Sequence, residues 1–226
     1  MQQIVNKNLV ILFTKEPKLG FVKTRLAKSC GGGFTLELYK KFVLDLVGTL
    51  QICKFDFKLC AYPNLEIINK IFGDFGNFLQ CDGDLGVKMQ TAFSRQFEKG
   101  YEKILLIGSD TPHLDCELLA KSFNALDNHE AVLGPSVDGG YYLIGFNKHT
   151  FCKDVFSDIP WSTDMVLKKT LHRLNTKRIY LLQELNDIDV LDDLISFYDE
   201  YKDGSFQESN TISFLKENSS WKNLMS

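Results

Sequence analysis

The chain has 226 residues, of which 44% are hydrophobic and 24% are charged, and this composition excludes a fully disordered protein. A net charge of -3 excludes the broad basic face that binding to a nucleic-acid backbone requires. No apolar run approaches the roughly 18 residues of a membrane-spanning helix. At this length, with 12% aromatic residues, we expect one domain with a substantial core.

Strand-like and helix-like segments alternate along the chain, which predicts an α/β fold. Short, continuously apolar runs predict strands at 9–14, 57–62, 77–80, 103–108, 131–134, 141–146 and 177–182. Apolar residues at helical spacing predict helices at 34–51, 85–99, 115–126, 161–174 and 189–201. We therefore expect a single domain over residues 1–201, followed by a polar, loosely docked tail at 202–226.

The six cysteines form neither a CxxC pair nor a zinc-like cluster with histidine: Cys30, Cys53, Cys60, Cys81, Cys116 and Cys152. The first apolar run, Leu9 to Phe13, is too short for the core of a signal peptide. We therefore expect reduced, mostly buried thiols and a cytoplasmic protein.

Ligands of an open α/β sheet bind beyond the carboxyl ends of its strands, so the residues there are the first candidates for a site. A basic loop, TKEPKLGFVKTRL, follows the first predicted strand. It is not a standard P-loop, because Val22 and not glycine precedes the Lys-Thr pair. It is either an ordinary solvated loop or a phosphate-binding loop that uses Gly20 for its turn and Lys15, Lys23, Thr24 and Arg25 as donors.

The strand at 103–108 leads into Ser109 and Asp110. A carboxylate at this position could hold a hard divalent cation through oxygen, or it could cap a turn.

The segment GPSVDGGYYLIGF also has two interpretations. An Asp-Gly pair between two apolar runs indicates a β-hairpin. The same residues could face a substrate, with Asp138 binding metal or hydroxyl groups and the glycines allowing a close approach to backbone; the candidates are Asp138, Gly139, Gly140 and Tyr141.

Two later segments begin predicted helices. Trp161, Ser162 and Thr163 open the first, with Ser162 or Thr163 as its N-cap. Asp187 and Asp189 open the last, where Asp189 is a plausible N-cap.

Taken in order, these motifs resemble a family of bacterial and archaeal glycosyltransferase-like proteins of unknown function, of the DUF2064 type. The matching segments are FTKEPKLGFVKTRL, LQCDGDLGVKM, LLIGSDTPHL, VLGPSVDGGYYLIGF, IPWST and NDIDVLDDL. They extend from about residue 9 to 195. The chain has Lys88 where the family usually has arginine.

The resemblance implies a nucleotide-diphospho-sugar transferase (GT-A) fold, a Rossmann-like three-layer α/β/α arrangement with a mainly parallel sheet. It implies phosphate contacts from Lys15, Lys23 and Arg25, and a Mg²⁺ or Mn²⁺ ion held by Asp110, with Asp189 as the second ligand and Asp187 as a weaker candidate. The turn at 138–140 would face the sugar or acceptor, with Tyr141, Trp161, Ser162 and Thr163 nearby. We expect Lys23 and Arg25 to stabilise the leaving phosphate and Asp138 to act as base.

Three functions remain open at this point. The first is a metal-dependent glycosyltransferase that uses a nucleotide sugar. The second is a nucleotidyltransferase that releases pyrophosphate, similar to the guanylyltransferases of molybdenum cofactor or phospholactate. The third is a non-catalytic nucleotide sensor. Each implies a nucleotide and a small molecule as partners, with no nucleic acid, and each leaves the oligomeric state open.

Overall fold

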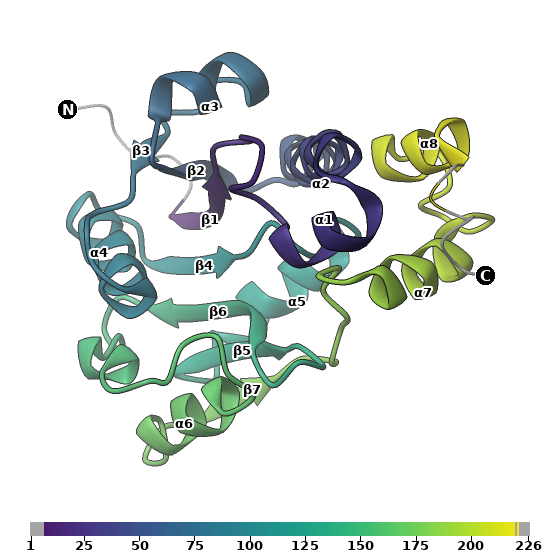
Figure 1. Ribbon diagram of the computed structural model, residues 1–226. Helices are drawn as coiled ribbons and strands as arrows, with labels where there is room; N and C mark the ends of the chain where they lie inside the picture. Colours follow the sequence, from purple (N-terminus) through teal and green to yellow (C-terminus); the bar gives the residue numbers. More distant parts are fainter. Residues whose placement is uncertain (1–6, 220, 222–226) are drawn as a thin grey trace.

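The computed structural model describes residues 7–219 and 221, and its centre is one seven-stranded sheet (Figure 1). The strands are β1 (Asn8–Lys15), β2 (Asp56–Tyr62), β3 (Phe78–Leu79), β4 (Lys103–Ile107), β5 (Ala131–Pro135), β6 (Tyr141–Asn147) and β7 (Ile179–Leu181). The helices are α1 (Thr24–Cys30), α2 (Gly32–Ile52), α3 (Leu65–Phe72), α4 (Leu85–Glu98), α5 (Cys116–Ala125), α6 (Val166–Arg173), α7 (Leu191–Tyr201) and α8 (Asn210–Glu217), with a 3₁₀ turn, η1 (Lys153–Phe156).

The strands lie in the order β3-β2-β1-β4-β6-β5-β7, and only β6 runs against its neighbours β4 and β5. The prediction of a mainly parallel sheet is therefore confirmed. β5 and β6 form the hairpin that the Asp-Gly pair indicates, closed by a hydrogen bond from the Ser136 N–H to the Gly140 carbonyl.

Helices cover both faces of the sheet. Successive side chains of β1 point to opposite faces, and all four from Leu9 to Leu12 are fully buried. Val10 and Leu12 pack in the cluster that includes α2, α3 and α5, whereas Leu9 and Ile11 pack with α4, η1 and α6. The expected three-layer arrangement is confirmed, and it explains why this strand is apolar without alternation. No helix in the described part of the chain is both long enough and apolar enough to cross a membrane.

The sequence did not predict helices α1, α3 and α8. In α1 only Leu26 is buried, so no apolar periodicity marks the helix, and this segment was expected to be loop. α3 has only eight residues, with Asn64 as its N-cap. The helix predicted at 161–174 is shorter, because Ser162 has a positive φ of 65° and helical geometry begins only at Val166. Neither Ser162 nor Thr163 is its N-cap, since Met165 takes that position.

The C-terminal segment is more firmly attached than predicted. α8 lies beside α2 and α7 (Figure 1), and Ile212, Leu215 and Trp221 are buried with residues of α1, α2 and α7. The carboxylate of Asp45 in α2 accepts hydrogen bonds from the backbone N–H groups of Asn210 and Thr211 and from both side chains. A loosely docked tail is therefore wrong for the described residues after 201. The segment looks polar because it contributes few apolar residues, but those few are buried in the cluster or packed against it.

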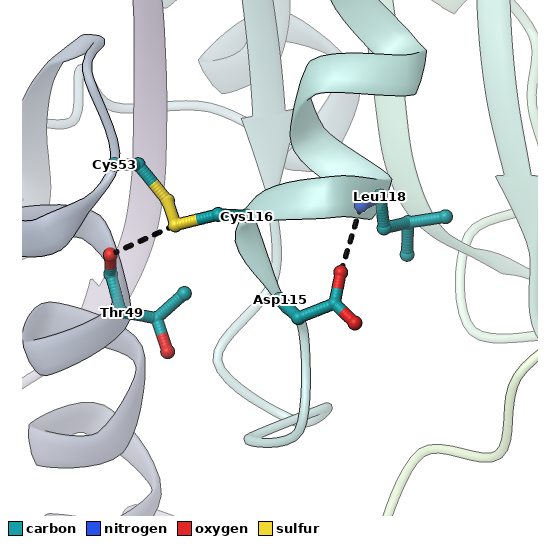
Figure 2. The surroundings of a disulfide bond; sticks show 5 residues. All are labelled: Thr49, Cys53, Asp115, Cys116 and Leu118. Carbon is teal, nitrogen blue, oxygen red and sulfur yellow. Dashed lines mark hydrogen bonds between the residues drawn. A yellow bond between two sulfur atoms is a disulfide. The ribbon is translucent and has the colours of Figure 1, made fainter.

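The expectation of six reduced thiols is also wrong. Cys53, just after α2, and Cys116, at the start of α5, form a disulfide with a Cα–Cα distance of 5.5 Å (Figure 2). The two cysteines are 63 residues apart in the sequence, so nothing local indicated the pair. Cys30, Cys60, Cys81 and Cys152 are free, but among them Cys60 alone is buried, so the expectation of mostly buried thiols is wrong as well. The cytoplasmic assignment rested on the short first apolar run and on reduced cysteines, and it loses the second of these two supports.

Candidate functional site

A cleft of 530 Å³ lies at the carboxyl ends of the parallel strands, where the topology gathers loops from distant parts of the sequence. Its lining includes Lys15 at the end of β1, Asp110 after β4 and Asp138 in the β5–β6 turn. The loop before α7 adds Asp187 and Asp189, and the N–H of Ile188 between them donates to the carbonyl of Asp110 at 3.0 Å. This hydrogen bond holds the two carboxylate-bearing loops together.

Lys23 is the central cation of the cleft. Its side chain is only 4% exposed, and its Nζ lies 2.7 Å from Oδ1 of Asp110 and 2.7 Å from Oδ1 of Asp189. Lys23 is also the N-cap of α1, with a left-handed backbone (φ 46°) that is uncommon for a residue with a side chain. Burial opposes its charge, but the two carboxylates outweigh this effect and raise the pKa of Lys23, so the ammonium stays charged.

The remaining basic residues are more accessible. Lys15 lines the cleft, and Arg25 is 64% exposed with its Nη1 4.0 Å from Oδ2 of Asp189. Thr24 also lines the cleft. Gly20 does not line the cleft. Its φ of +74° allows the turn that precedes Lys23 and Arg25.

Asp138, in the turn between Ser136 and Gly140, both stabilises this turn and lines the cleft. Oδ1 of Asp138 accepts hydrogen bonds from Ser136 Oγ and from the Gly140 N–H at 2.8 Å, so this oxygen stabilises the turn, while the residue also lines the cleft. Gly139 has a φ of +85°, and a Cβ there would lie 2.3 Å from the carbonyl oxygen of Asp164. Gly139 is therefore required for the turn to pack on this segment. Neither Gly139 nor Gly140 lines the cleft.

The other predicted substrate-facing residues are divided. Ser162 and Thr163 line the cleft, although Thr163 Oγ1 donates to the Pro160 carbonyl at 2.7 Å. Tyr141 lines a neighbouring pocket. Trp161 lines neither cavity. Its ring packs against Gly86 at the start of α4, where an added Cβ would lie 3.0 Å from the indole.

Asp187 differs electrostatically from Asp189. Burial, together with the nearby charges of Asp138 and Asp189, raises the pKa of Asp187 to about 7. For Asp189, burial also favours the neutral form, but the ammonium of Lys23 outweighs it and lowers the pKa. The cleft thus contains one carboxyl that exchanges its proton near neutral pH beside one that stays ionised. Asp189 is not the N-cap of α7, because Val190 takes that position, and Oδ2 of Asp193 accepts from the Asp189 and Val190 N–H groups. The carboxylate of Asp189 pairs with Lys23.

Tyr39 of α2 was missed in the sequence, where it looks like one more core aromatic residue. Its hydroxyl donates to the Lys15 carbonyl at 3.1 Å and accepts from the Lys15 N–H at 2.9 Å. Ser109 Oγ lies 3.4 Å from the same hydroxyl. Tyr39 therefore connects the end of β1 to the loop that contains Asp110.

A second pocket of 450 Å³ adjoins the cleft and shares Lys15, Phe21, Ser109 and Asp110 with it. Its remaining walls are mostly apolar or aromatic: Phe13, Tyr62, Gln80, Leu85, Lys88, Met89, Leu106, Gly108, Tyr141 and Tyr142. The Nζ of Lys88 lies 3.7 Å from the centre of the Tyr62 ring, so the pocket also offers a cation–π pair.

The donor set of the cleft fits a Mg²⁺ or Mn²⁺ ion bound with phosphate. Among the residues that the structure describes, no group of three or more His, Cys, Asp or Glu side chains is placed to hold a metal ion. Asp110 and Asp189 remain 44% and 36% exposed, and each has one oxygen on Lys23. Two carboxylates completed by substrate phosphates and water are the usual protein environment of Mg²⁺.

Comparison with known proteins agrees with the fold. The model of a family described as an uncharacterized protein conserved in bacteria, DUF2064, matches residues 56–163. A structure from Desulfovibrio desulfuricans G20, provisionally named a nucleotide-diphospho-sugar transferase, is 34% identical, covers 97% of this chain and 98% of its own, and has a TM-score of 0.92. None of the curated proteins matches this chain.

Two more distant structures share the fold alone. The 4-diphosphocytidyl-2C-methyl-D-erythritol synthase of Anaerococcus prevotii is 14% identical over 84% of this chain and 94% of its own, with a TM-score of 0.57. A cytidylyltransferase of Leptospira borgpetersenii is 14% identical over 96% of both chains, with a TM-score of 0.56.

Proposed function

This chain belongs to the DUF2064 family of bacterial proteins, and we propose that it is a transferase that moves a sugar from a nucleoside diphosphate sugar to an acceptor hydroxyl. The relative from Desulfovibrio desulfuricans, provisionally named a nucleotide-diphospho-sugar transferase, supports the general class. The apolar pocket and the charged cleft beside it support binding of the nucleoside in the first and of the diphosphate where the two meet.

We place the nucleoside in the apolar pocket and the diphosphate where this pocket meets the cleft. The pocket offers aromatic surfaces and the Lys88–Tyr62 pair to a flat base. Lys15 lines both cavities, and Lys23 and Arg25 line the cleft beyond it. A diphosphate at this junction would meet cations, as its charge requires.

Three further carboxylates of the cleft support the proposal of a hydroxyl acceptor. Asp138, Asp164 and Asp187 line the cleft, and a phosphorylated acceptor would be repelled beside them. A neutral acceptor with several hydroxyl groups fits carboxylate partners. Asp187 in its deprotonated form is suited to remove a hydroxyl proton, because its pKa of about 7 matches neutral conditions. The structure thus favours Asp187 over Asp138 as base, since one oxygen of Asp138 is already used by its own turn.

The proposed reaction is a displacement at the sugar. The acceptor oxygen forms a bond to the anomeric carbon as the bond from that carbon to the diphosphate oxygen breaks, and the hydroxyl proton passes to Asp187. Lys15, Lys23 and Arg25 stabilise the negative charge that remains on the nucleoside diphosphate. A Mg²⁺ or Mn²⁺ ion on Asp110 and Asp189 would add Lewis-acid stabilisation of the same leaving group.

A second candidate, nucleotidyl transfer with release of pyrophosphate, is favoured by the shared fold of the two cytidyl-transferring enzymes. Both reactions use the same pocket for the nucleoside. They differ in the bond that breaks, and therefore in the product that is released.

A thermal-shift panel of nucleotide sugars and nucleoside triphosphates, with and without Mg²⁺ or Mn²⁺, tests the proposal. A ligand at 100 times its Kd stabilises the protein by about 2.7 kcal/mol. Release of a nucleoside diphosphate from the nucleotide sugar that binds supports glycosyl transfer, whereas pyrophosphate from a triphosphate supports the second candidate. Binding without either product would indicate a nucleotide sensor.

The role of Asp187 has its own test. Asp187→Asn should lower turnover by ~10²–10⁴ and abolish the rise of rate with pH around 7. Asp192→Asn, an exposed substitution in the first turn of α7, should leave both unchanged. A wild-type pH profile in Asp187→Asn would exclude Asp187 as the base.

A further inference from the structure

Lys23 lies at the point that a metal shared by Asp110 and Asp189 would approach. Its Nζ is 2.7 Å from one oxygen of each carboxylate, and these two residues come from loops 79 positions apart in the sequence. The side chain is 4% exposed, so water contributes little to the solvation of its charge. The carboxylates are the partners that keep this ammonium buried.

We infer that Lys23 competes with a divalent cation for Asp110 and Asp189, so that the cation binds tightly only when a phosphate chain takes over Lys23. This inference rests on the proposed function, because it uses the same phosphate and metal positions. It adds an order to the binding: metal and polyphosphate enter together, and a metal ion alone is rejected.

The physical reason is the charge balance of the cleft. A divalent cation between the two carboxylates would lie beside a buried ammonium and would compete with it for both of its partners. A buried charge without a partner is strongly unfavourable, and two like charges at close range repel. A polyphosphate changes this balance, since its oxygens accept hydrogen bonds from Lys23 and also coordinate the metal.

Arg25 is not suited to this role. It is 64% exposed and lies 4.0 Å from Asp189, so solvent screens its charge and supplies alternative hydrogen bonds. The left-handed backbone at Lys23 belongs to the N-cap that starts α1. The N-cap position fixes the backbone of Lys23, and its ammonium lies between Asp110 and Asp189.

Mn²⁺ binding measured by water-proton relaxation enhancement tests the competition directly, because the signal rises when the ion is held by the slowly tumbling protein. We would titrate Mn²⁺ into the full chain alone and with pyrophosphate. Solutions of Mn²⁺ and pyrophosphate without protein, and the variant Asp110→Asn, correct for complexes formed outside the site. We expect pyrophosphate to tighten Mn²⁺ binding to the wild-type protein at least tenfold.

Lys23→Met removes the competing charge, so we expect it to bind Mn²⁺ alone at least tenfold more tightly than the wild-type protein does. Lys28→Met, which removes an exposed lysine of the same helix, should bind Mn²⁺ as the wild type does. Lys23→Gln is the second variant should Lys23→Met fail to fold, and the wild-type comparison needs no variant.

The outcomes separate the two proposals. Equal Mn²⁺ affinity of the wild type with and without pyrophosphate, lost in Asp110→Asn, would overturn the competition and leave the metal site standing. Unchanged Mn²⁺ affinity in both folded Lys23 variants would also overturn it. Failure of every protein to bind Mn²⁺, with or without pyrophosphate, would overturn both the competition and the metal-dependent part of the proposed function.

Discussion

At the scale of single residues, Asp187 is a carboxyl group whose charge the fold opposes. Its pKa rises from an ordinary value of 3.8 to about 7, first through burial and then through Asp138 and Asp189. Between these pH values the unfolded chain has released the proton that the folded chain still holds. The folded state therefore loses stability as pH rises from about 4 to 7.

Asp187→Asn should remove this loss. We expect the variant to gain stability relative to the wild type between pH 4 and pH 8, by on the order of 1 kcal/mol, because partial exposure reduces the full effect. Urea denaturation at both pH values measures the difference. A constant difference between the two proteins across this range would contradict the raised pKa.

Tyr39 is a second residue whose contacts exceed its sequence signal. Its hydroxyl bonds to the backbone of Lys15 on both its N–H and carbonyl sides, in a buried position. Tyr39→Phe should cost about 1–2 kcal/mol of unfolding free energy and weaken nucleotide binding, because Lys15 loses its fixed position. Tyr180→Phe, a substitution of the same type on β7, is the control and should preserve nucleotide affinity. Unchanged nucleotide affinity in Tyr39→Phe would exclude the positioning role.

At the scale of elements, α8 is attached to α2 through one carboxylate as well as through apolar contacts. Asp45 is 7% exposed and accepts from the first two residues of α8, whose N–H groups have no partner within their own helix. The favourable position of a negative charge at a helix N-terminus adds to these bonds.

Asp45→Ala should therefore lower the unfolding free energy by about 2–4 kcal/mol, since it removes the partner of both N–H groups and leaves the buried one, of Thr211, unpaired. Glu37→Ala, an exposed position on the same helix, should change it by no more than about 0.5 kcal/mol. Chemical denaturation monitored by tryptophan fluorescence in a Trp161→Phe background, where Trp221 is the remaining tryptophan, would follow the α8 region in particular. Equal stability of the two variants would show that α8 is held by its apolar contacts alone.

At the scale of the whole molecule, the disulfide connects two helices on one face of the sheet. Cys53 and Cys116 are 63 positions apart and close a loop that contains β2, β3, β4, α3 and α4. Cross-linking a loop of this size restricts the unfolded chain and typically stabilises a protein by about 2–4 kcal/mol.

The Cys53→Ser, Cys116→Ser double variant should lose about that amount, whereas Cys81→Ser should not. Thiol titration of the unreduced, denatured wild-type protein should find four free thiols of the six cysteines. Six thiols in protein kept from reductants would contradict the disulfide.

Much of the fold could be predicted from the sequence because its signals are local. The buried strands at 9–14 and 103–108 are continuous apolar runs, and the hairpin around Asp138 is marked by its Asp-Gly turn. α1, α3 and α8 were missed because each is short. α1 buries only Leu26 within its own span, so no amphipathic pattern reveals it.

For the candidate site, the sequence by itself placed the chemical groups at the ends of strands, including the basic loop, Asp110, Asp138 and the two aspartates before α7. Parallel strands bring those ends to one edge whatever the lengths of the connections between them, so their convergence was predictable. Only the tertiary structure decided how they pair. Burial of Lys23 between Asp110 and Asp189, the proton retained by Asp187, the Tyr39 contact and the Cys53–Cys116 bond all depend on distances between residues far apart in the sequence. Charge, solvation and covalent pairing respond to distance in space, and sequence separation does not specify that distance.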